Sequence, residues 1–334
     1  MGASRNGAPL HSIRDLPMSK VTTLGATRAA GRHTGFAWGW MGVALLAHTS
    51  WGAYPVLARY LQTVSGLPSM ALLGFGNLIA VALLLPFVHR HIRLRHLRSP
   101  MLWAFSLVVV LRAITNLLSA RFTLAIYVQL ITLMTPLLVA LLSAGLFRER
   151  LPPYTWPAIG LSLLGSLLMM SGDMGGGLGL ALTSADLLGI GLALVSMFCL
   201  AIYMLLVPRT VKETLPGEAV LMMQLVSLTL TCGAISVLAG EDLGRFAAIG
   251  PRDWAVFAAF VVFVLLGANM GQITALRHLG APLVSSTMAW RLCATLALAA
   301  LLLGERLTTP WQILGTLVVL ATITAYLWRQ RRPA

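Results

Sequence analysis

The chain has 334 residues, of which 58% are hydrophobic and only 10% are charged, and its mean hydropathy is +0.84. Soluble domains carry about 25% charged residues, so this composition excludes an ordinary soluble domain and indicates a membrane protein. The formal net charge of +14 would also suit a nucleic-acid-binding protein. Because the basic residues cluster in short loops between apolar segments, we expect them to face membrane lipid and expect no nucleic-acid partner.

The first 35 residues contain no apolar segment. Five of them are basic and one is acidic. This composition favours a disordered basic tail over a membrane span or a secretory signal. Residues 1–35 are therefore predicted to form a cytoplasmic tail.

Ten later segments are long and apolar enough to cross a bilayer, which takes about 20 predominantly apolar residues in a helix. Their bounds are 36–60, 67–88, 101–120, 124–147, 153–171, 186–208, 218–240, 254–276, 281–303 and 309–328. None shows the alternating pattern of outer-membrane barrel strands. Since a backbone in lipid must satisfy its own hydrogen bonds, we predict an all-α polytopic membrane protein with ten transmembrane helices.

The placement of Lys and Arg predicts the orientation. If the N-terminus is cytoplasmic, 17 of the 24 basic residues fall on the cytoplasmic side, 5 on the outer side and 2 inside spans. Cytoplasmic loops of membrane proteins are enriched in Lys and Arg. We therefore expect an integral protein of the bacterial inner membrane with both termini in the cytoplasm.

One short motif occurs twice. The stretch "LFRERLPPYTW" begins at Leu146 and "LLLGERLTTPW" begins at Leu301. Their overlay aligns two acidic and two basic residues, which are Glu149 with Glu305 and Arg150 with Arg306. The motif marks the same hairpin in two copies of one structural unit.

The two copies divide the chain into halves of five spans each, 36–171 and 186–328. A Gly-rich linker, 172–185, joins them, and a basic cytoplasmic tail, 329–334, follows. Because five is odd, the second half must be inverted relative to the first. Inverted repeats are a common construction of secondary transporters, in which substrates bind between the repeats.

The chain resembles the drug/metabolite transporter superfamily, specifically its EamA-type members. The resemblance covers about 36–328 and rests on the ten spans, the duplication, "GERL" and "RERL" at matching places, and "HTSWGAYPVLARY" in the first span. It implies transport of a small metabolite, commonly by export. Two features depart from the family pattern: Arg148 replaces the usual Gly of the first motif, and the ninth span contains a Trp–Arg pair.

Two arginines inside spans are the main candidates for substrate binding. Arg112 lies near the middle of the third span with Asn116 one turn later, and Arg291 follows Trp290 at the middle of the ninth. An Arg at the centre of a membrane helix costs about 2.5–3.5 kcal/mol on insertion scales, so each needs a compensating contact. Arg112 either binds an anionic substrate group or pairs with another helix, and Arg291 either lines a cavity or serves helix packing.

Further candidates are polar or aromatic residues within spans. His48 and Trp51 share a face of the first span, where His48 is either a buried structural residue or a proton carrier. The fourth span places Gln129 beside Thr132 and Pro136 on one polar, kinked face. In the eighth span Asn269 and Gln272 are candidate hydrogen-bond donors. The further candidates of the spans are thus His48, Trp51, Gln129, Asn269 and Gln272.

The repeated motif is expected to be structural. Glu149 and Glu305 lie at helix ends, where each can cap the helix that follows, and Arg150 and Arg306 can lie among lipid headgroups. Asp186 is likewise expected to cap the sixth span. No enzyme motif, cofactor motif or metal-ligand spacing is present, so we expect neither an enzyme nor a cofactor or metal.

These patterns predict a secondary transporter that moves an amino acid or another carboxylate-bearing metabolite, as an exporter, by alternating access about a cavity between the repeats. A carrier of hydrophobic or cationic compounds is the first alternative. A membrane scaffold without transport activity, or an intramembrane enzyme, is the second.

Overall fold

The computed structural model describes residues 34–88, 100–147, 154–174, 177–179, 182–210, 217–279, 284 and 287–330. The chain divides into a short unit, Met1–Gly39, and a main unit, Trp40–Ala334, and only the main unit is described below. The predicted N-terminal tail lies almost wholly outside the described residues. So do most of the C-terminal tail and the first motif with Glu149 and Arg150.

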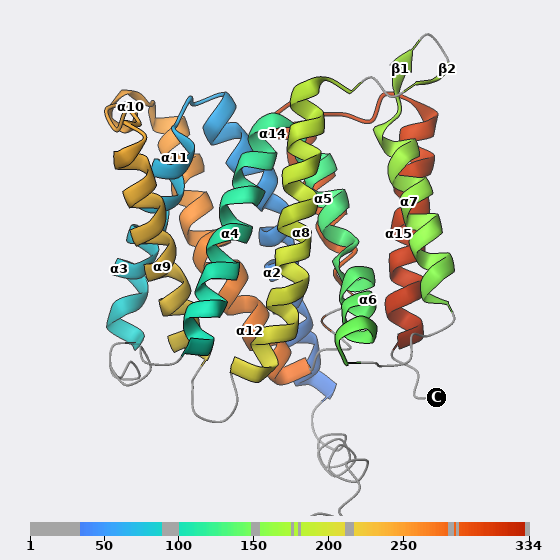
Figure 1. Ribbon diagram of the computed structural model, residues 1–334, viewed down its shortest axis with the longest axis horizontal. Coiled ribbons are helices and arrows are strands. Elements are labelled where there is room, and N and C mark those ends of the chain that lie inside the picture. The colour runs from blue at the N-terminus through green and yellow to red at the C-terminus, as the bar shows by residue number, and fades with distance from the viewer. Residues whose placement is uncertain are drawn as a thin grey trace, which may run out of the picture. The chain divides into compact units, whose positions relative to one another are not determined.

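Every predicted span overlaps with one helix or with consecutive helices of the described chain (Figure 1). The first half contains α2 (Thr34–Thr63), α3 (Ser69–Val88), α4 (Pro100–Phe122), α5 (Ala125–Leu133), α6 (Thr135–Phe147) and α7 (Thr155–Met170). The second half contains α8 (Ser184–Thr210), α9 (Gly217–Leu238), α10 (Arg245–Ala248), α11 (Pro251–Ala259), the π-helix η3 (Phe260–Ala268), α12 (Asn269–Leu279), α14 (Trp290–Leu302) and α15 (Pro310–Gln330). Within the predicted linker, β1 (Gly172–Met174) pairs antiparallel with β2 (Gly177–Gly179).

The helices have the length and composition of membrane spans. Within the described residues, seven helical stretches are long and apolar enough to cross a bilayer, while α7 and α14 are apolar but shorter. The long helix α2 is not among the seven, since His48, Arg59 and other polar residues lower its mean hydropathy. Many leucines on the outer faces are exposed, as expected of side chains that contact lipid. The prediction of an all-helical polytopic membrane protein is confirmed.

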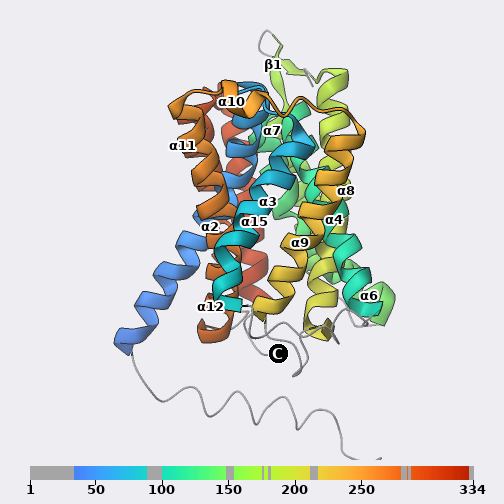
Figure 2. The same ribbon diagram turned by 90° about the vertical axis from the view of Figure 1, so that its left-hand side faces the viewer.

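The two halves run in opposite directions. In Figure 1, α4 and α7 run from the lower to the upper end, whereas the corresponding third and fifth segments of the second half, α11–η3–α12 and α15, run downward. The most extensive contacts join one helix of each half: α4 with α8, α3 with α9, and α7 with α15, as both views show (Figures 1 and 2). The inverted five-helix repeat predicted from the motif is therefore seen in the fold.

Small residues set the spacing of the α7–α15 pair. A Cβ atom built on Gly315 would collide with the backbone of Gly165 and with the amide nitrogen of Met169. Only glycine at this position permits the close approach of the two backbones, which is how small residues act at membrane helix interfaces.

Three spans are interrupted. The fourth breaks at Met134, between α5 and α6, next to Pro136, and the freed carbonyl of Thr132 accepts a hydrogen bond from the hydroxyl of Thr135. Proline cannot donate the backbone hydrogen bond that would continue the helix. The kink expected from Pro136 is therefore present as a complete break.

The other two interruptions lie in the second half. In the eighth span the backbone is a π-helix over Phe260–Ala268, a form that the sequence did not predict. In the ninth, α14 begins only at Trp290, preceded by a turn at 287–289. Trp290 and Arg291, which were predicted near the middle of the ninth span, thus occupy the first turn of α14.

Candidate functional site

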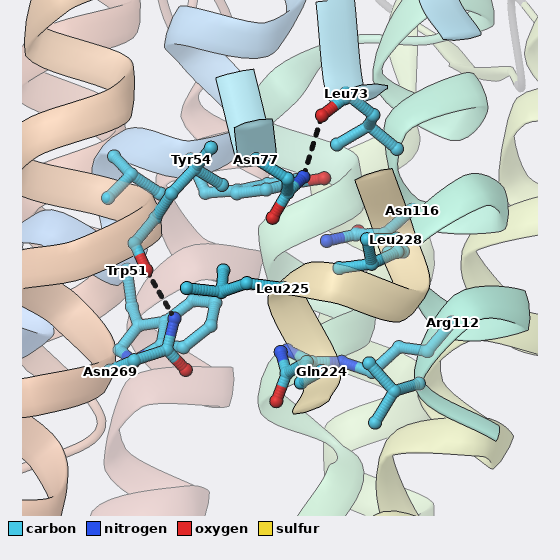
Figure 3. Close-up of a pocket in the computed structure, with 14 residues that line it drawn as sticks. Trp51, Tyr54, Leu73, Asn77, Arg112, Asn116, Gln224, Leu225, Leu228 and Asn269 are labelled. Atoms are coloured by element: carbon cyan, nitrogen blue, oxygen red, sulfur yellow. Dashed lines mark hydrogen bonds between the residues drawn. The ribbon is translucent and has the colours of Figure 1, made fainter. Parts of the chain in front are cut away.

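A pocket lies between the two halves. Its 14 lining residues come from α2, α3 and α4 of the first half and from α9, η3 and α12 of the second. The cavity among them offers about 40 Å³ to the centres of water-sized molecules. Figure 3 shows the polar and aromatic members; the lining residues are Trp51, Tyr54, Leu73, Asn77, Val109, Arg112, Ala113, Asn116, Gln224, Leu225, Leu228, Val264, Leu265 and Asn269.

Arg112 is the only charged residue among the described residues that line this pocket. Its guanidinium carbon lies 5.3 Å from the ring centre of Trp51 and 5.6 Å from that of Tyr203, which are cation–π distances. Within the described part of the chain, its side chain forms neither a hydrogen bond nor an ion pair; its contacts are the two aromatic rings. The planar donors of Arg112 are thus available to a ligand.

Arg291 is held by protein groups instead. Its Nε donates to Nδ1 of His48 at 2.9 Å and its Nη2 donates to Oε1 of Gln272 at 3.2 Å. Its guanidinium carbon lies 5.6 Å from the ring centre of Trp51, so one indole interacts with both Arg112 and Arg291. Arg291 does not line the pocket and is only 3% exposed. It supports Trp51 from outside the pocket.

The contacts of His48 define its tautomer. Because the guanidinium N–H of Arg291 can only donate, Nδ1 of His48 accepts, and its Nε2–H donates to the carbonyl of Val284 at 3.0 Å. A second proton on the ring would place an N–H group against the N–H of Arg291. His48 is therefore neutral in this conformation and links α2 to Val284 and α14, as a structural residue does.

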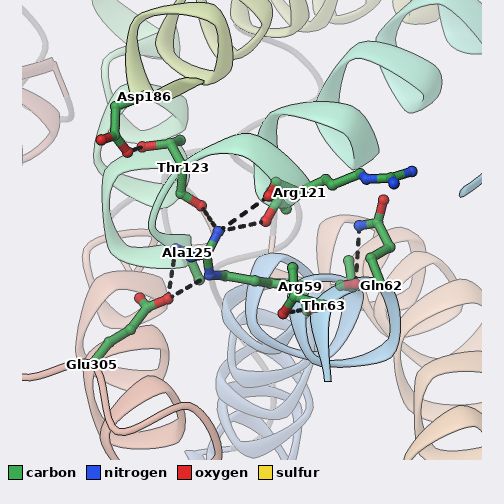
Figure 4. A network of polar contacts seen from close by, with 10 residues as sticks. Arg59, Gln62, Thr63, Arg121, Thr123, Ala125, Asp186 and Glu305 are labelled. Atoms are coloured by element: carbon green, nitrogen blue, oxygen red, sulfur yellow. Dashed lines mark hydrogen bonds and ion pairs between the residues drawn. The ribbon is translucent and has the colours of Figure 1, made fainter. Parts of the chain in front are cut away.

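A second polar cluster lies where the α4–α5 and α14–α15 connections meet α2 (Figure 4). Nε of Arg59 lies 2.9 Å from Oε1 of Glu305, and Nη1 of Arg59 donates to the carbonyls of Ala120, Arg121 and Thr123 at the end of α4. The same Glu305 oxygen accepts the backbone N–H of Ala125 at the start of α5. The cation thus lies at a helix C-terminus and the anion at an N-terminus, as helix dipoles favour.

Glu305 is deeply buried for an acid, with a side chain that is 6% exposed. Burial raises the pKa of Glu305 above the ordinary carboxyl value, while the charge of Arg59 and the backbone N–H groups of Ala125 and Ile126 oppose that rise. The expectation that Glu305 caps the next helix was wrong, because it caps α5 of the other half. Arg306 is exposed.

Asp186 extends this cluster to α8. Its carboxylate accepts the backbone N–H and the hydroxyl of Thr183, and the Thr183 hydroxyl accepts the N–H of Asp186, which is a capping box. The other carboxylate oxygen accepts the hydroxyl of Thr123 at 2.9 Å. The predicted capping role of Asp186 is confirmed, and the residue also ties α8 to the α4–α5 connection.

The family model described as "EamA-like transporter family" matches residues 38–171 and again 187–328. The chain belongs to the EamA-like transporter family. It is therefore a membrane transporter, and the resemblance inferred from the sequence is confirmed.

Solved structures share the fold of this EamA-like transporter. One of 21 matching chains, described only as "Crystal structure of protein", has 16% sequence identity and a TM-score of 0.59 over 88% of this chain and 99% of that chain. At this identity the likeness concerns the fold alone. No curated protein matches significantly.

The pocket of this EamA-like transporter unites four of the nine substrate-binding candidates, which are Trp51, Arg112, Asn116 and Asn269. The others lie elsewhere. Gln129 is buried on α5, and Trp290 is 48% exposed, with its indole N–H donating to Oγ1 of Thr49. His48, Gln272 and Arg291 form the group behind Trp51.

Three polar residues of the pocket were missing from the candidates: Tyr54, Asn77 and Gln224. The signal that identified Asn116 was present for both amides, since Asn77 interrupts "GFGNLIAV" and Gln224 interrupts "LMMQLVSL". The described residues contain no group of His, Cys, Asp or Glu that could hold a metal ion.

Proposed function

We propose that this transporter moves a small carboxylate-bearing metabolite, an amino acid or another organic acid, by alternating access about the pocket between the repeats. The observation that carries the proposal is Arg112, a half-buried guanidinium in the pocket without a hydrogen-bond or carboxylate partner among the described residues. A desolvated charge is costly unless it is paired. A guanidinium binds a carboxylate through two parallel hydrogen bonds.

The charge of the pocket argues against the alternatives. Arg112 lines it, Arg291 also contacts the Trp51 ring, and none of the described lining residues is acidic. A cationic substrate would be repelled, and a purely apolar one would leave Arg112 unpaired. A scaffold or an intramembrane enzyme gains nothing from an unpaired cation between inverted repeats.

Alternating access is supported by the polar cluster at the upper end of Figure 1. Arg59 and Thr123 belong to the first half, and Glu305 and Asp186 belong to the second. Opening the transport path at this end separates these partners. With both termini in the cytoplasm of a bacterial cell, as the Lys and Arg bias favours, this end faces outward, and export requires it to open after substrate has bound.

The test is flux measured in proteoliposomes that contain the purified protein. A broad panel of labelled metabolites, including amino acids, hydroxy acids, amines and neutral compounds, is loaded on one side, and protein-free liposomes provide the background. We expect flux of at least one carboxylate, competition by other carboxylates and none by amines. Arg112→Ala should abolish the flux. Flux of amines that is independent of Arg112, or no flux of any compound, would contradict the proposal.

A further inference from the structure

Four of the eight buried side-chain atoms without a hydrogen-bond partner in the described first half line the pocket. Four buried side-chain atoms of its lining have no partner in the described structure: Nε1 of Trp51, the Tyr54 hydroxyl, Oδ1 of Asn77 and Oδ1 of Asn116. An unmet polar group buried in an apolar interior destabilises the protein. Their convergence on one pocket indicates that a bound molecule satisfies them.

Asn77 is the most constrained of these residues. It is 0% exposed, and its Nδ2 donates to the carbonyl of Leu73 at 2.8 Å (Figure 3). That hydrogen bond fixes the orientation of the amide, because only the nitrogen can donate to a carbonyl. Oδ1 is thus the free end of Asn77, and it can only accept a hydrogen bond.

The pocket therefore combines two kinds of group. Arg112 and the indole N–H of Trp51 are donors and match a carboxylate. Oδ1 of Asn77 is an acceptor and matches an O–H or N–H group. Because no acidic residue is present among the 14 described lining residues, an ammonium group finds no protein counter-ion and must be on the same molecule as the carboxylate.

We propose that Asn77 is a specificity-determining residue that selects carboxylates bearing a hydrogen-bond donor, a hydroxyl or ammonium group, over carboxylates without one. This inference rests on the proposed function, since it assumes that the carboxylate is bound at Arg112. A site with buried acceptors rejects the analogue that lacks the donor, because the acceptor then stays unpaired.

The probes are two matched series of acids that differ only at the carbon next to the carboxylate. The first is L-alanine, L-lactate and propionate, and the second is L-phenylalanine, L-3-phenyllactate and 3-phenylpropionate. Affinity is measured by competition against flux of the best carboxylate of the panel in proteoliposomes. In each series the wild-type protein should bind the donor-bearing acids about tenfold more tightly than the unsubstituted acid.

Asn77→Leu, of similar size, should reduce this ratio to near one while leaving the affinity for propionate and 3-phenylpropionate unchanged. Ser106→Ala is the matched control, because Ser106 is a buried polar residue of α4 without a partner for its hydroxyl that does not line the pocket, and its ratio should equal that of the wild type. The ratio is internal to each variant, so lower expression or stability does not alter it.

Different results would contradict the proposed function and the role of Asn77. If no acid of either series competes and Arg112→Ala changes nothing, the proposed function is wrong. If the acids compete through Arg112 but the wild-type protein does not discriminate within a series, or if discrimination survives in Asn77→Leu, then the role of Asn77 is wrong and the proposed function stands.

Discussion

Nε of Arg59 lies 2.9 Å from Oε1 of Glu305, and this ion pair joins helix α2 of the first half to the α14–α15 connection of the second. The pair is not isolated. Arg59 also binds the carbonyls at the end of α4, and Glu305 accepts the first N–H of α5, so the two side chains close the α4–α5 connection from both sides. The pair thus holds the end of α4 and the start of α5 against α2 and the α14–α15 connection.

The first prediction concerns the stability of this cluster. Arg59→Ala should lower the free energy of unfolding by about 2 kcal/mol, because it leaves the carboxylate of Glu305 buried without its cation. Glu305→Gln should cost less, since the amide oxygen still accepts from Ala125 and from Arg59. Unfolding of the purified variants in one detergent, followed by tryptophan fluorescence, gives the comparison. Equal losses in the two variants would contradict this ranking, because they would show that a neutral amide cannot replace the carboxylate.

The second prediction is the pH dependence of that loss. Burial raises the pKa of Glu305, so over a range above the ordinary carboxyl value the folded protein holds a proton that the unfolded chain has released. Stability therefore falls as pH rises through that range. Without Arg59 the pKa of Glu305 is higher still and the range is wider. The destabilisation by Arg59→Ala should thus be small at acidic pH and grow toward neutral pH.

Unfolding experiments on Arg59→Ala and wild type at several pH values test this sign. The double variant Arg59→Ala/Glu305→Gln is the control, because it removes the titrating group and should lose the extra pH dependence. A loss that is constant with pH, or larger in acid, would contradict the assignment of the effect to Glu305.

The third prediction separates the two intramembrane arginines. Arg112→Met removes a half-buried charge that no described residue pairs, so it should abolish transport while leaving the protein as stable as the wild type or more stable. Arg291→Met removes the partner of His48 and Gln272 and should lower stability by about 1–3 kcal/mol. Thermal unfolding and flux of both variants give the test. A stability loss in Arg112→Met equal to that in Arg291→Met would show that Arg112 has a structural role.

Sequence patterns predicted the helices well because membrane spans depend on length and composition alone. The ten segments and the inverted repeat are local or periodic properties, which one chain displays directly. The π-helix over Phe260–Ala268 and the start of α14 at Trp290 were not predicted, since both depend on packing against other helices. The break near Pro136, in contrast, could be predicted, because proline disrupts the helix in which it lies.

The site was predicted less completely, for a related reason. A polar residue in an apolar segment is visible in the sequence, and this signal identified Arg112, Asn116 and Asn269. This signal could not show that Arg112 lines the pocket whereas Arg291 is bound by protein groups. That difference depends on His48, which is 243 residues away from Arg291 in the chain. The pairing of Glu305 with Arg59 could not be predicted for the same reason, because the two residues lie far apart in the chain.

The last prediction concerns Gly52, which lies one residue after Trp51 on α2. A Cβ atom at this position would lie 2.5 Å from the carbonyl oxygen of Arg291, and the carbonyl of Gly52 accepts the hydroxyl of Thr295 at 2.7 Å. Gly52→Ala must therefore push α14 away from α2 and disturb the contact between Arg291 and His48. We expect a stability loss of about 1–3 kcal/mol, as for other overpacked positions, together with reduced transport. Gly42→Ala on the same helix is the control, since a Cβ there meets nothing within 4 Å and should be tolerated. If Gly52→Ala proves as harmless as Gly42→Ala in both flux and unfolding experiments, the close contact of α2 with α14 does not position Arg291.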